Sequence, residues 1–173
     1  MAAKPGDIQL LVLDVDGVLT DGSVLLADDG SELKRFNAKD GAAIRWWLRS
    51  GRQMAWISGR ESPAVLHRAQ DLGVPHVYQR VMDKLKVYTG LLEELGISAQ
   101  KTACMGDDLM DLPILTRCGF SIAVADAMAE IRDMAELVTQ RCGGRGAVAE
   151  AVRFLLKAAG DWQAVTARYT KED

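Results

Sequence analysis

Short apolar runs and longer amphipathic segments alternate along this chain. The short runs indicate buried strands at residues 10–13, 53–58, 76–78, 102–105, 120–124 and 137–139. The segments between them indicate helices at 40–50, 62–72, 84–95, 109–116, 128–134 and 147–159, several of them followed by glycine. Because strands that alternate with helices form parallel sheets, the pattern predicts an α/β fold with a doubly wound parallel sheet.

One stretch departs from this alternation. Residues 24–36 predict a small β-hairpin, with β-prone runs at 24–27 and 32–36 around an Asp-Asp-Gly-Ser turn. Val24, Leu25 and Leu26 form an apolar patch on it, and an isolated two-stranded ribbon is marginal in water. We therefore expect the hairpin to pack on another subunit. After residue 159 the chain predicts a polar tail, at about 160–173, and whether this tail is ordered stays open.

Length and composition narrow the class of protein. The 173 residues suit one domain, and 49% hydrophobic with 26% charged residues is an ordinary globular balance. A net charge of -3 without a basic stripe argues against nucleic acid as a partner, and no apolar run approaches the roughly 20 residues that span a bilayer. The three cysteines are scattered and lack metal-ligand spacing, which favours reduced thiols in a cytoplasmic protein.

The candidate chemistry begins where the first strand ends. Asp14 and Asp16 follow the apolar run at 10–13, and side chains two apart in an extended chain point the same way. Gly17 then lets the backbone approach a ligand closely. Two acids beside a buried strand are tolerated mainly when a cation or a chemical task compensates. We interpret the pair as part of a metal-assisted phosphoryl-transfer site with Asp14 as nucleophile.

Other strand ends supply matching groups. Ligands of open α/β sheets bind beyond the carboxyl ends of the strands, and Ser58 and Lys84 follow the second and third strands. Carboxylates follow the fourth strand, at Asp107, Asp108 and Asp111. Carboxylate oxygens suit Mg²⁺, whereas the hydroxyl and the ammonium can donate to phosphate oxygens.

Each group also has a plainer interpretation. Acids are common at helix N-termini, so the cluster at 107–111 alone would carry little weight. Ser58 taken alone could be a helix cap and Lys84 a solvated residue. A phospho-aspartate receiver module or an inactive oligomeric scaffold remain rival classes. The acid pair at 14 and 16 favours hydrolysis, because a receiver does not need a general acid two residues after its phosphorylated aspartate.

Four motifs in order, DVDGVLTDG, ISGR, DK and GDDLMDLP, resemble the haloacid dehalogenase superfamily, over about residues 10–146. Within it, FNAKDG, SGRESPAVLHRAQDLG, YQRVMDK and GGRGAV resemble the 3-deoxy-D-manno-octulosonate 8-phosphate (KDO 8-phosphate) phosphatases, enzymes of lipopolysaccharide biosynthesis. The resemblance implies a Rossmann-like domain over 1–173 with no large cap domain beyond the small hairpin. It also implies a homotetramer whose neighbouring subunits close the site.

The resemblance also implies roles. Asp14 would form an aspartyl-phosphate, and Asp16 would act as general acid and then as general base. Mg²⁺ would be held by Asp14, Asp107 and the backbone carbonyl of Asp16, with Asp108 and Asp111 orienting the shell. Ser58 and Lys84 would bind the phosphate. The residues implied in substrate binding are Asp16, Asn37, Lys39, Asp40, Gly41, Arg45, Arg60, Arg68 and Lys84.

The implied substrate is a phosphorylated 2-keto-3-deoxy sugar acid, most simply the eight-carbon KDO 8-phosphate. Cationic groups near the site suit its carboxylate. Lys39, Arg80 and Ala149 stand where the family pattern leads us to expect arginine, glycine and arginine. A nonulosonate 9-phosphate or another sugar phosphate therefore stays open as the alternative.

Overall fold

The computed structural model describes residues 4–170 and contains a six-stranded sheet in the order β5-β4-β1-β6-β7-β8. Every neighbouring pair in it is parallel, which confirms the doubly wound α/β prediction. The strands are β1 (Leu10–Leu13), β4 (Gln53–Ile57), β5 (His76–Tyr78), β6 (Thr102–Gly106), β7 (Phe120–Ala123) and β8 (Leu137–Val138).

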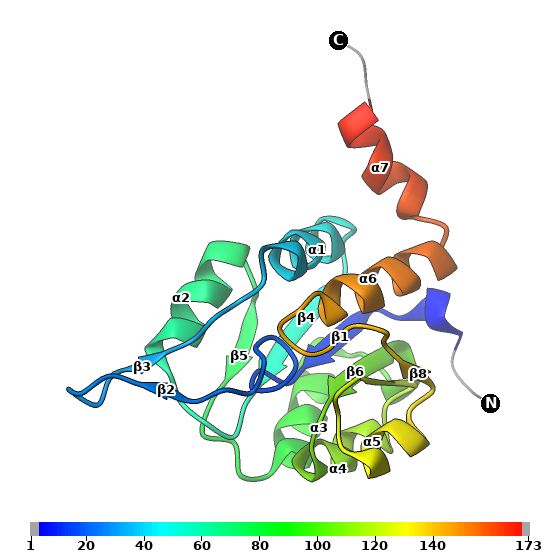
Figure 1. Cartoon of the computed structure of the whole chain (residues 1–173). Coiled ribbons are helices and arrows are strands. Elements are labelled where there is room, and N and C mark those ends of the chain that lie inside the picture. Colours follow the sequence, from blue (N-terminus) through cyan, green and yellow to red (C-terminus); the bar gives the residue numbers. More distant parts are fainter. Residues whose placement is uncertain (1–3, 171–173) are drawn as a thin grey trace.

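Helices cover both faces of this sheet (Figure 1). On one face α1 (Ala38–Arg49) packs against α6 (Ala147–Ala158), and on the other α3 (Lys84–Leu95) packs against α4 (Leu112–Leu115). The remaining helices are α2 (Pro63–Leu72), α5 (Ala129–Met134) and α7 (Trp162–Thr170), with single 3₁₀ turns η1 (Pro5–Asp7), η2 (Ala99–Lys101) and η3 (Leu109–Asp111). No helix within residues 4–170 is both long and apolar enough to cross a membrane.

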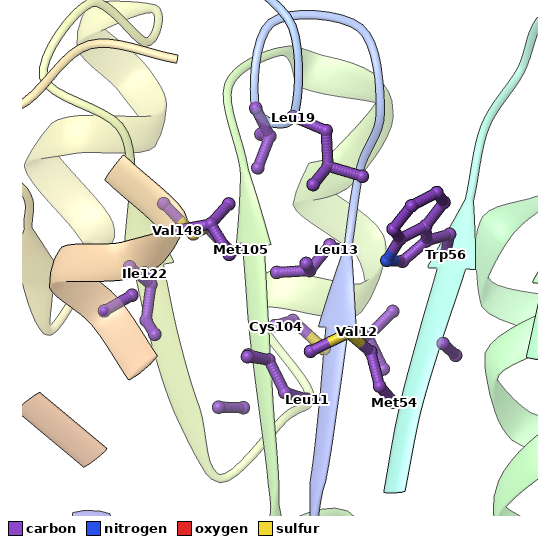
Figure 2. Packing of buried hydrophobic residues seen from close by; sticks show 14 of the residues in the cluster. Leu11, Val12, Leu13, Leu19, Met54, Trp56, Cys104, Met105, Ile122 and Val148 are labelled. Atoms are coloured by element: carbon purple, nitrogen blue, oxygen red, sulfur yellow. The ribbon is translucent and has the colours of Figure 1, made fainter. Parts of the chain in front are cut away.

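The core is centred on β1, whose four residues are all fully buried. Figure 2 shows Leu11, Val12 and Leu13 between Trp56 on β4 and Met105 on β6. A strand that is covered on both faces cannot alternate apolar and polar residues, so β1 is a continuous apolar run. The first polar side chains after β1 therefore emerge at its carboxyl end, where the sheet opens to ligands.

Strand order reverses beside β1. From β1 the chain builds one side of the sheet through β4 and β5, and then crosses over to β6. The carboxyl ends of β1 and β6 are therefore the switch point of the sheet, where open α/β sheets bind their ligands.

The hairpin is present, with shorter strands than the sequence indicates. β2 (Leu25–Leu26) pairs antiparallel with β3 (Glu32–Leu33), and the hairpin projects from the body of the molecule (Figure 1). Leu26 and Leu33 are about two-thirds exposed. No large cap domain is inserted within the described residues, as the sequence predicts.

One helix start predicted from the sequence is wrong. Helix α1 begins at Ala38, not at Asp40, because the Asn37 side chain accepts a hydrogen bond from the Lys39 amide and caps it. In the tail after residue 159, whose order the sequence left open, the helix α7 (Trp162–Thr170) forms, and 171–173 lie outside the described residues. Trp162 packs edge-on against Trp46, which attaches α7 to α1.

Candidate active site

Asp14 leaves the carboxyl end of β1 and lies in a buried row of alternating charges. Its amide donates to the Met105 carbonyl at 3.0 Å, which continues the pairing with β6. The Lys84 ammonium donates to Asp14 Oδ1 at 2.5 Å and to Asp111 Oδ1 at 2.6 Å. Burial alone would lower the pKa of Lys84, but the charges of Asp14 and Asp111 raise it above its usual value. Lys84 is therefore an ammonium shared by two carboxylates.

Asp111 fixes the loop after β6. Its Oδ2 accepts hydrogen bonds from the amides of Asp107, at 3.1 Å, and Asp108, at 3.3 Å. A β-carbon on Gly106 would lie 2.5 Å from the Asp111 β-carbon, so only glycine lets the loop close over this carboxylate. Both oxygens of Asp111 thus already have donors.

Asp107 has a free acceptor in the same place. Within residues 4–170 its buried Oδ1 has no hydrogen-bond partner. A β-carbon on Gly17 would lie only 2.0 Å from the Oδ2 atom of Asp107. Carboxylate oxygens of Asp14, Asp107 and Asp111 lie within 4.8 Å of one another.

The charges of this cluster are not balanced by Lys84 alone. Burial, together with Asp14 and Asp111, raises the pKa of Asp107 to about 8. Burial and Asp111 also raise the pKa of Asp14, against the opposing effect of Lys84. A divalent cation would relieve both carboxylates, and hard oxygen donors suit Mg²⁺. Asp14 and Asp107 are the side chains that fit as ligands, and Asp111 fits as the group that orients Asp107.

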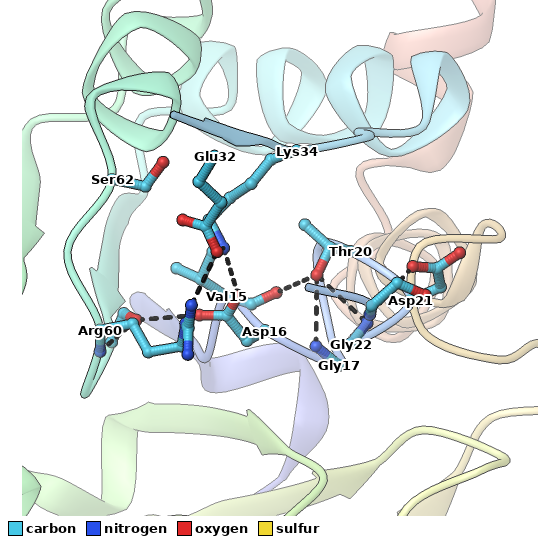
Figure 3. Close-up of polar contacts among 12 residues, drawn as sticks. Val15, Asp16, Gly17, Thr20, Asp21, Gly22, Glu32, Lys34, Arg60 and Ser62 are labelled. Carbon is cyan, nitrogen blue, oxygen red and sulfur yellow. Dashed lines mark hydrogen bonds and ion pairs between the residues drawn. The ribbon is translucent and has the colours of Figure 1, made fainter. Parts of the chain in front are cut away.

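Asp16 is held by side chains from two other parts of the chain (Figure 3). The Ser58 hydroxyl, at the end of β4, donates to Asp16 Oδ2 at 3.2 Å and accepts from the Arg60 amide at 3.0 Å. The Lys34 ammonium forms an ion pair with Asp16 Oδ1. Sequence reasoning missed Lys34, since only the folding of the hairpin brings it to the site.

Asp108 does not point into the cluster. Its carboxylate accepts from the Leu109 amide, and it forms a reciprocal capping box with Asp111 at η3. Asp108 therefore caps the start of a helical turn, which agrees with the plainer interpretation of acids at a helix N-terminus. It fixes the turn that carries Asp107, and after burial, Asp14 and Asp111 its charge also contributes to the raised pKa of Asp107.

The residues implied in substrate binding do not all gather beside Asp16. Arg60 lies near Asp16, where its guanidinium pairs with Glu32 at 2.8 Å. Asn37 caps α1 and, with Lys39, lines a separate hollow of about 410 Å³ beside Arg145.

Asp40 is engaged within the fold. Its two oxygens accept the amides of Gly146, at 3.2 Å, and Ala149, at 2.8 Å, at the first turn of α6. Burial raises the pKa of Asp40 even though these amides favour its charged form. The residue therefore connects α1 to α6.

Arg45 on α1 and Arg68 on α2 share one acidic partner. Arg45 donates to the Asp71 carboxylate at 3.1 Å and Arg68 donates to it at 2.8 Å. A β-carbon on Gly41 would lie 2.2 Å from Arg68 Nη2, so glycine gives this guanidinium its path across α1. Within this chain, these three residues join α1 to α2.

A glycine pair later in the chain closes over the loop after β1. A β-carbon on Gly143 would lie 1.6 Å from the Gly17 carbonyl oxygen, and the Gly144 amide donates to the Val18 carbonyl at 2.9 Å. The Gly143 amide itself donates to Asp126 at 2.9 Å. The loop that carries Asp16 is thus held by residues from the C-terminal third of the chain.

Comparison with known proteins gives consistent matches. A family described as haloacid dehalogenase-like hydrolase matches residues 70–152. The chain is 46% identical over 158 residues to the 3-deoxy-D-manno-octulosonate 8-phosphate phosphatase KdsC of Escherichia coli K12, which covers 91% of this chain and 84% of that protein.

Solved structures agree with the sequence match. A probable YrbI family phosphatase from Pseudomonas syringae is 42% identical with a TM-score of 0.96, covering 98% of this chain and 97% of that one. A 3-deoxy-D-manno-octulosonate 8-phosphate phosphatase from Moraxella catarrhalis is 37% identical with a TM-score of 0.95, over 96% of each chain. That structure is a complex with magnesium ion, phosphate ion and KDO.

Proposed function

The chain belongs to the haloacid dehalogenase-like hydrolases, and from this premise we propose that it is a Mg²⁺-dependent phosphatase that converts KDO 8-phosphate to KDO and phosphate. One observation carries the proposal. Among residues 4–170 the buried Oδ1 of Asp107 has no hydrogen-bond partner, and it lies in a carboxylate cluster with Asp14, beside the shared ammonium of Lys84. A divalent cation supplies the positive charge that these carboxylates lack, and the cation and the Lys84 ammonium together can then attract a phosphate.

The first chemical step uses Asp14. A carboxylate oxygen of Asp14 attacks phosphorus, the bond from phosphorus to the sugar oxygen breaks, and an aspartyl-phosphate forms. Asp16 donates a proton to the departing sugar oxygen. The Lys84 ammonium and the Ser58 hydroxyl donate to the phosphate oxygens and stabilise their charge in the transition state.

The second step regenerates the enzyme. Asp16, now a carboxylate, accepts a proton from water, and the water oxygen attacks the aspartyl-phosphate. Asp14 leaves as a carboxylate and phosphate is released. Mg²⁺, when held by Asp14, Asp107 and the Asp16 carbonyl, neutralises charge on the transferring phosphoryl group.

The substrate class follows from the matched relatives and from the cations around the site. Arg60 lies near Asp16 with its side chain 48% exposed, and a guanidinium there suits the carboxylate of a keto-sugar acid. A nonulosonate 9-phosphate offers the same carboxylate on a chain one carbon longer, and it is the alternative substrate.

A panel of phosphate esters tests the function. We expect Mg²⁺-dependent phosphate release from KDO 8-phosphate, with much slower release from a nonulosonate 9-phosphate and from simple sugar phosphates. Asp14→Asn should abolish release from every ester, whereas Asp133→Asn, an exposed control on α5, should match the wild type. Faster turnover of the nonulosonate ester would keep the chemistry and change the substrate. No Mg²⁺-dependent release from any ester would exclude the phosphatase.

We also propose that the chain works as one domain in a cytoplasmic homotetramer. The hairpin exposes Val24, Leu25, Leu26 and Leu33, a patch that is stabilised when another subunit covers it. Light scattering on the purified protein should give four times the chain mass. Leu26→Lys should shift the mass towards smaller species, whereas Phe154→Lys, an exposed apolar residue on α6, should not. A wild-type monomer would exclude this assembly.

A further inference from the structure

Lys34 has a buried ammonium group and lies on the return side of the hairpin, directly after β3. Its side chain is 2% exposed, although it lies in a segment that projects from the body of the protein. Lysine is almost never fully buried unless it is paired. Lys34 has two acidic partners, Asp16 from the loop after β1 and Glu32 from β3.

The ion pair continues outward to the end of β4 (Figure 3). Glu32 Oε1 accepts from Lys34 at 3.3 Å and from Arg60 at 2.8 Å. The charges therefore alternate from Asp16 through Lys34 and Glu32 to Arg60. This row attaches the return strand of the hairpin to two strand ends of the sheet.

In the described part of the chain, two side chains contact the Asp16 carboxylate, and of these only Lys34 has no other role in the proposed reaction. The other partner, Ser58, has to donate to phosphate in the proposed mechanism, and one hydroxyl hydrogen cannot serve both acceptors. Once phosphate is bound, the Lys34 contact is the remaining side-chain restraint on the Asp16 carboxylate within residues 4–170.

We propose that Lys34 is a positioning residue that holds the Asp16 side chain where the leaving oxygen departs and where water enters, with Glu32 and Arg60 fixing the ammonium. The proposal rests on the proposed phosphatase function and deepens it. The hairpin would then contribute directly to acid–base chemistry, since the group that orients Asp16 is part of it.

Leaving groups of different basicity separate this role from a general loss of structure. An alkyl ester such as KDO 8-phosphate needs a proton on its departing oxygen, whereas p-nitrophenolate departs without one. Misplacing Asp16 should therefore slow attack on the alkyl ester but spare the first step with p-nitrophenyl phosphate. Hydrolysis of the aspartyl-phosphate also needs Asp16, so that step should slow for both esters.

Lys34→Met removes the ammonium and keeps the length of the side chain. We expect kcat for KDO 8-phosphate to fall roughly 100- to 1,000-fold with KM changed less than about threefold, within the range of general acid–base contributions. In rapid mixing with p-nitrophenyl phosphate, the first turnover should stay within about threefold of the wild-type rate, followed by a slow steady state. Lys157→Met, an exposed change on α6, is the matched control. Lys34→Arg, which keeps the cation, should recover part of the lost kcat.

The outcomes separate the two proposals. Equal slowing of both esters in the first turnover, or a wild-type kcat in Lys34→Met, would overturn the role of Lys34 while the phosphatase function stands. A wild-type protein inactive on both esters would overturn the function itself. Glu32→Gln provides a second test if Lys34→Met unfolds. It should reproduce the same split between esters in weaker form, and equal slowing of both esters would overturn the positioning role.

Discussion

A β-carbon on Gly17 would lie 2.0 Å from the Oδ2 atom of Asp107. The loop after β1 and the loop after β6 therefore approach each other so closely that a single methyl group would separate them. Gly17 also has φ +97°, a conformation that side chains rarely adopt. Asp107, the candidate metal ligand, can therefore take this position only because residue 17, in the loop after β1, has no side chain.

Gly17→Ala should displace Asp107 and weaken Mg²⁺ binding. We expect a loss of kcat/KM of about 100-fold or more, because misplacing a group by about 1 Å can cost that much. Gly51→Ala is the matched control, since Gly51 has φ +83° and no atom within 4 Å of its would-be β-carbon. It should cost only about 1 kcal/mol of unfolding free energy and leave Mg²⁺ affinity unchanged by calorimetry. Equal Mg²⁺ affinity in both variants would contradict the steric argument.

The metal-free protein should lose stability as pH rises. The pKa of Asp107 is raised to about 8, whereas an unfolded aspartate has a pKa near 3.8. The folded state therefore retains a proton between these values, and stability declines from about pH 4 until it levels off above about pH 8, by up to about 1.4 kcal/mol per pH unit. Urea unfolding in EDTA between pH 6 and 9 measures this slope.

Two additions check the cause of that slope. Asp107→Asn removes the titrating group and should flatten the decline. Excess Mg²⁺ should raise stability most at the high end of the range, because the cation binds the ionised carboxylates. A slope unchanged in Asp107→Asn would assign the pH dependence to other groups.

Asp111→Asn should loosen the loop that carries Asp107. An amide nitrogen cannot accept the hydrogen bonds that Asp111 Oδ2 receives from the amides of Asp107 and Asp108. We expect Mg²⁺ affinity to fall about 10- to 100-fold, as is typical when a group that orients a ligand is lost. Calorimetric titration measures it, with Asp133→Asn as the exposed control. Affinity equal to that of the control would show that Asp111 does not orient Asp107.

Arg80→Gly should stabilise the fold. Arg80 has φ 57°, and it is the non-glycine residue with positive φ among residues 4–170. Its side chain is 77% exposed and pairs with Glu61, a contact worth little at the surface. Glycine should relieve about 1 kcal/mol of backbone strain, whereas Arg80→Ala removes the side chain and keeps most of the strain. Thermal unfolding of the two variants compares these effects, and a destabilised Arg80→Gly would mean that the ion pair outweighs the strain.

The sequence predicted the strand ends well for a physical reason. A sheet covered on both faces forces its central strands to be apolar, so polar residues mark where each strand stops, as at Asp14 and Ser58. Parallel strands then bring those ends to one edge. Asp107 and Lys84 follow from the same rule, which is why the buried cluster could be predicted from one chain.

Contacts between distant loops could not be predicted in this way. Lys34 lies in a hairpin whose direction depends on how it folds back over the sheet, and no local pattern encodes that direction. Asp40 and Asn37 both suit a helix start, and only the packing of α6 against α1 decides which residue caps α1. Helix α7 likewise depends on the pairing of Trp162 with Trp46.

The contact of Gly143 and Gly144 with the loop at 17–18 has a consequence for the order of synthesis. Strand β1 leaves the ribosome long before its neighbour β6 and before the glycines that close over its loop. Ribosomes extend a chain at about 5–20 residues per second, so β1 waits several seconds for these partners. During that interval its four apolar residues are exposed to chaperones, and a nascent chain released before residue 144 has no closed site.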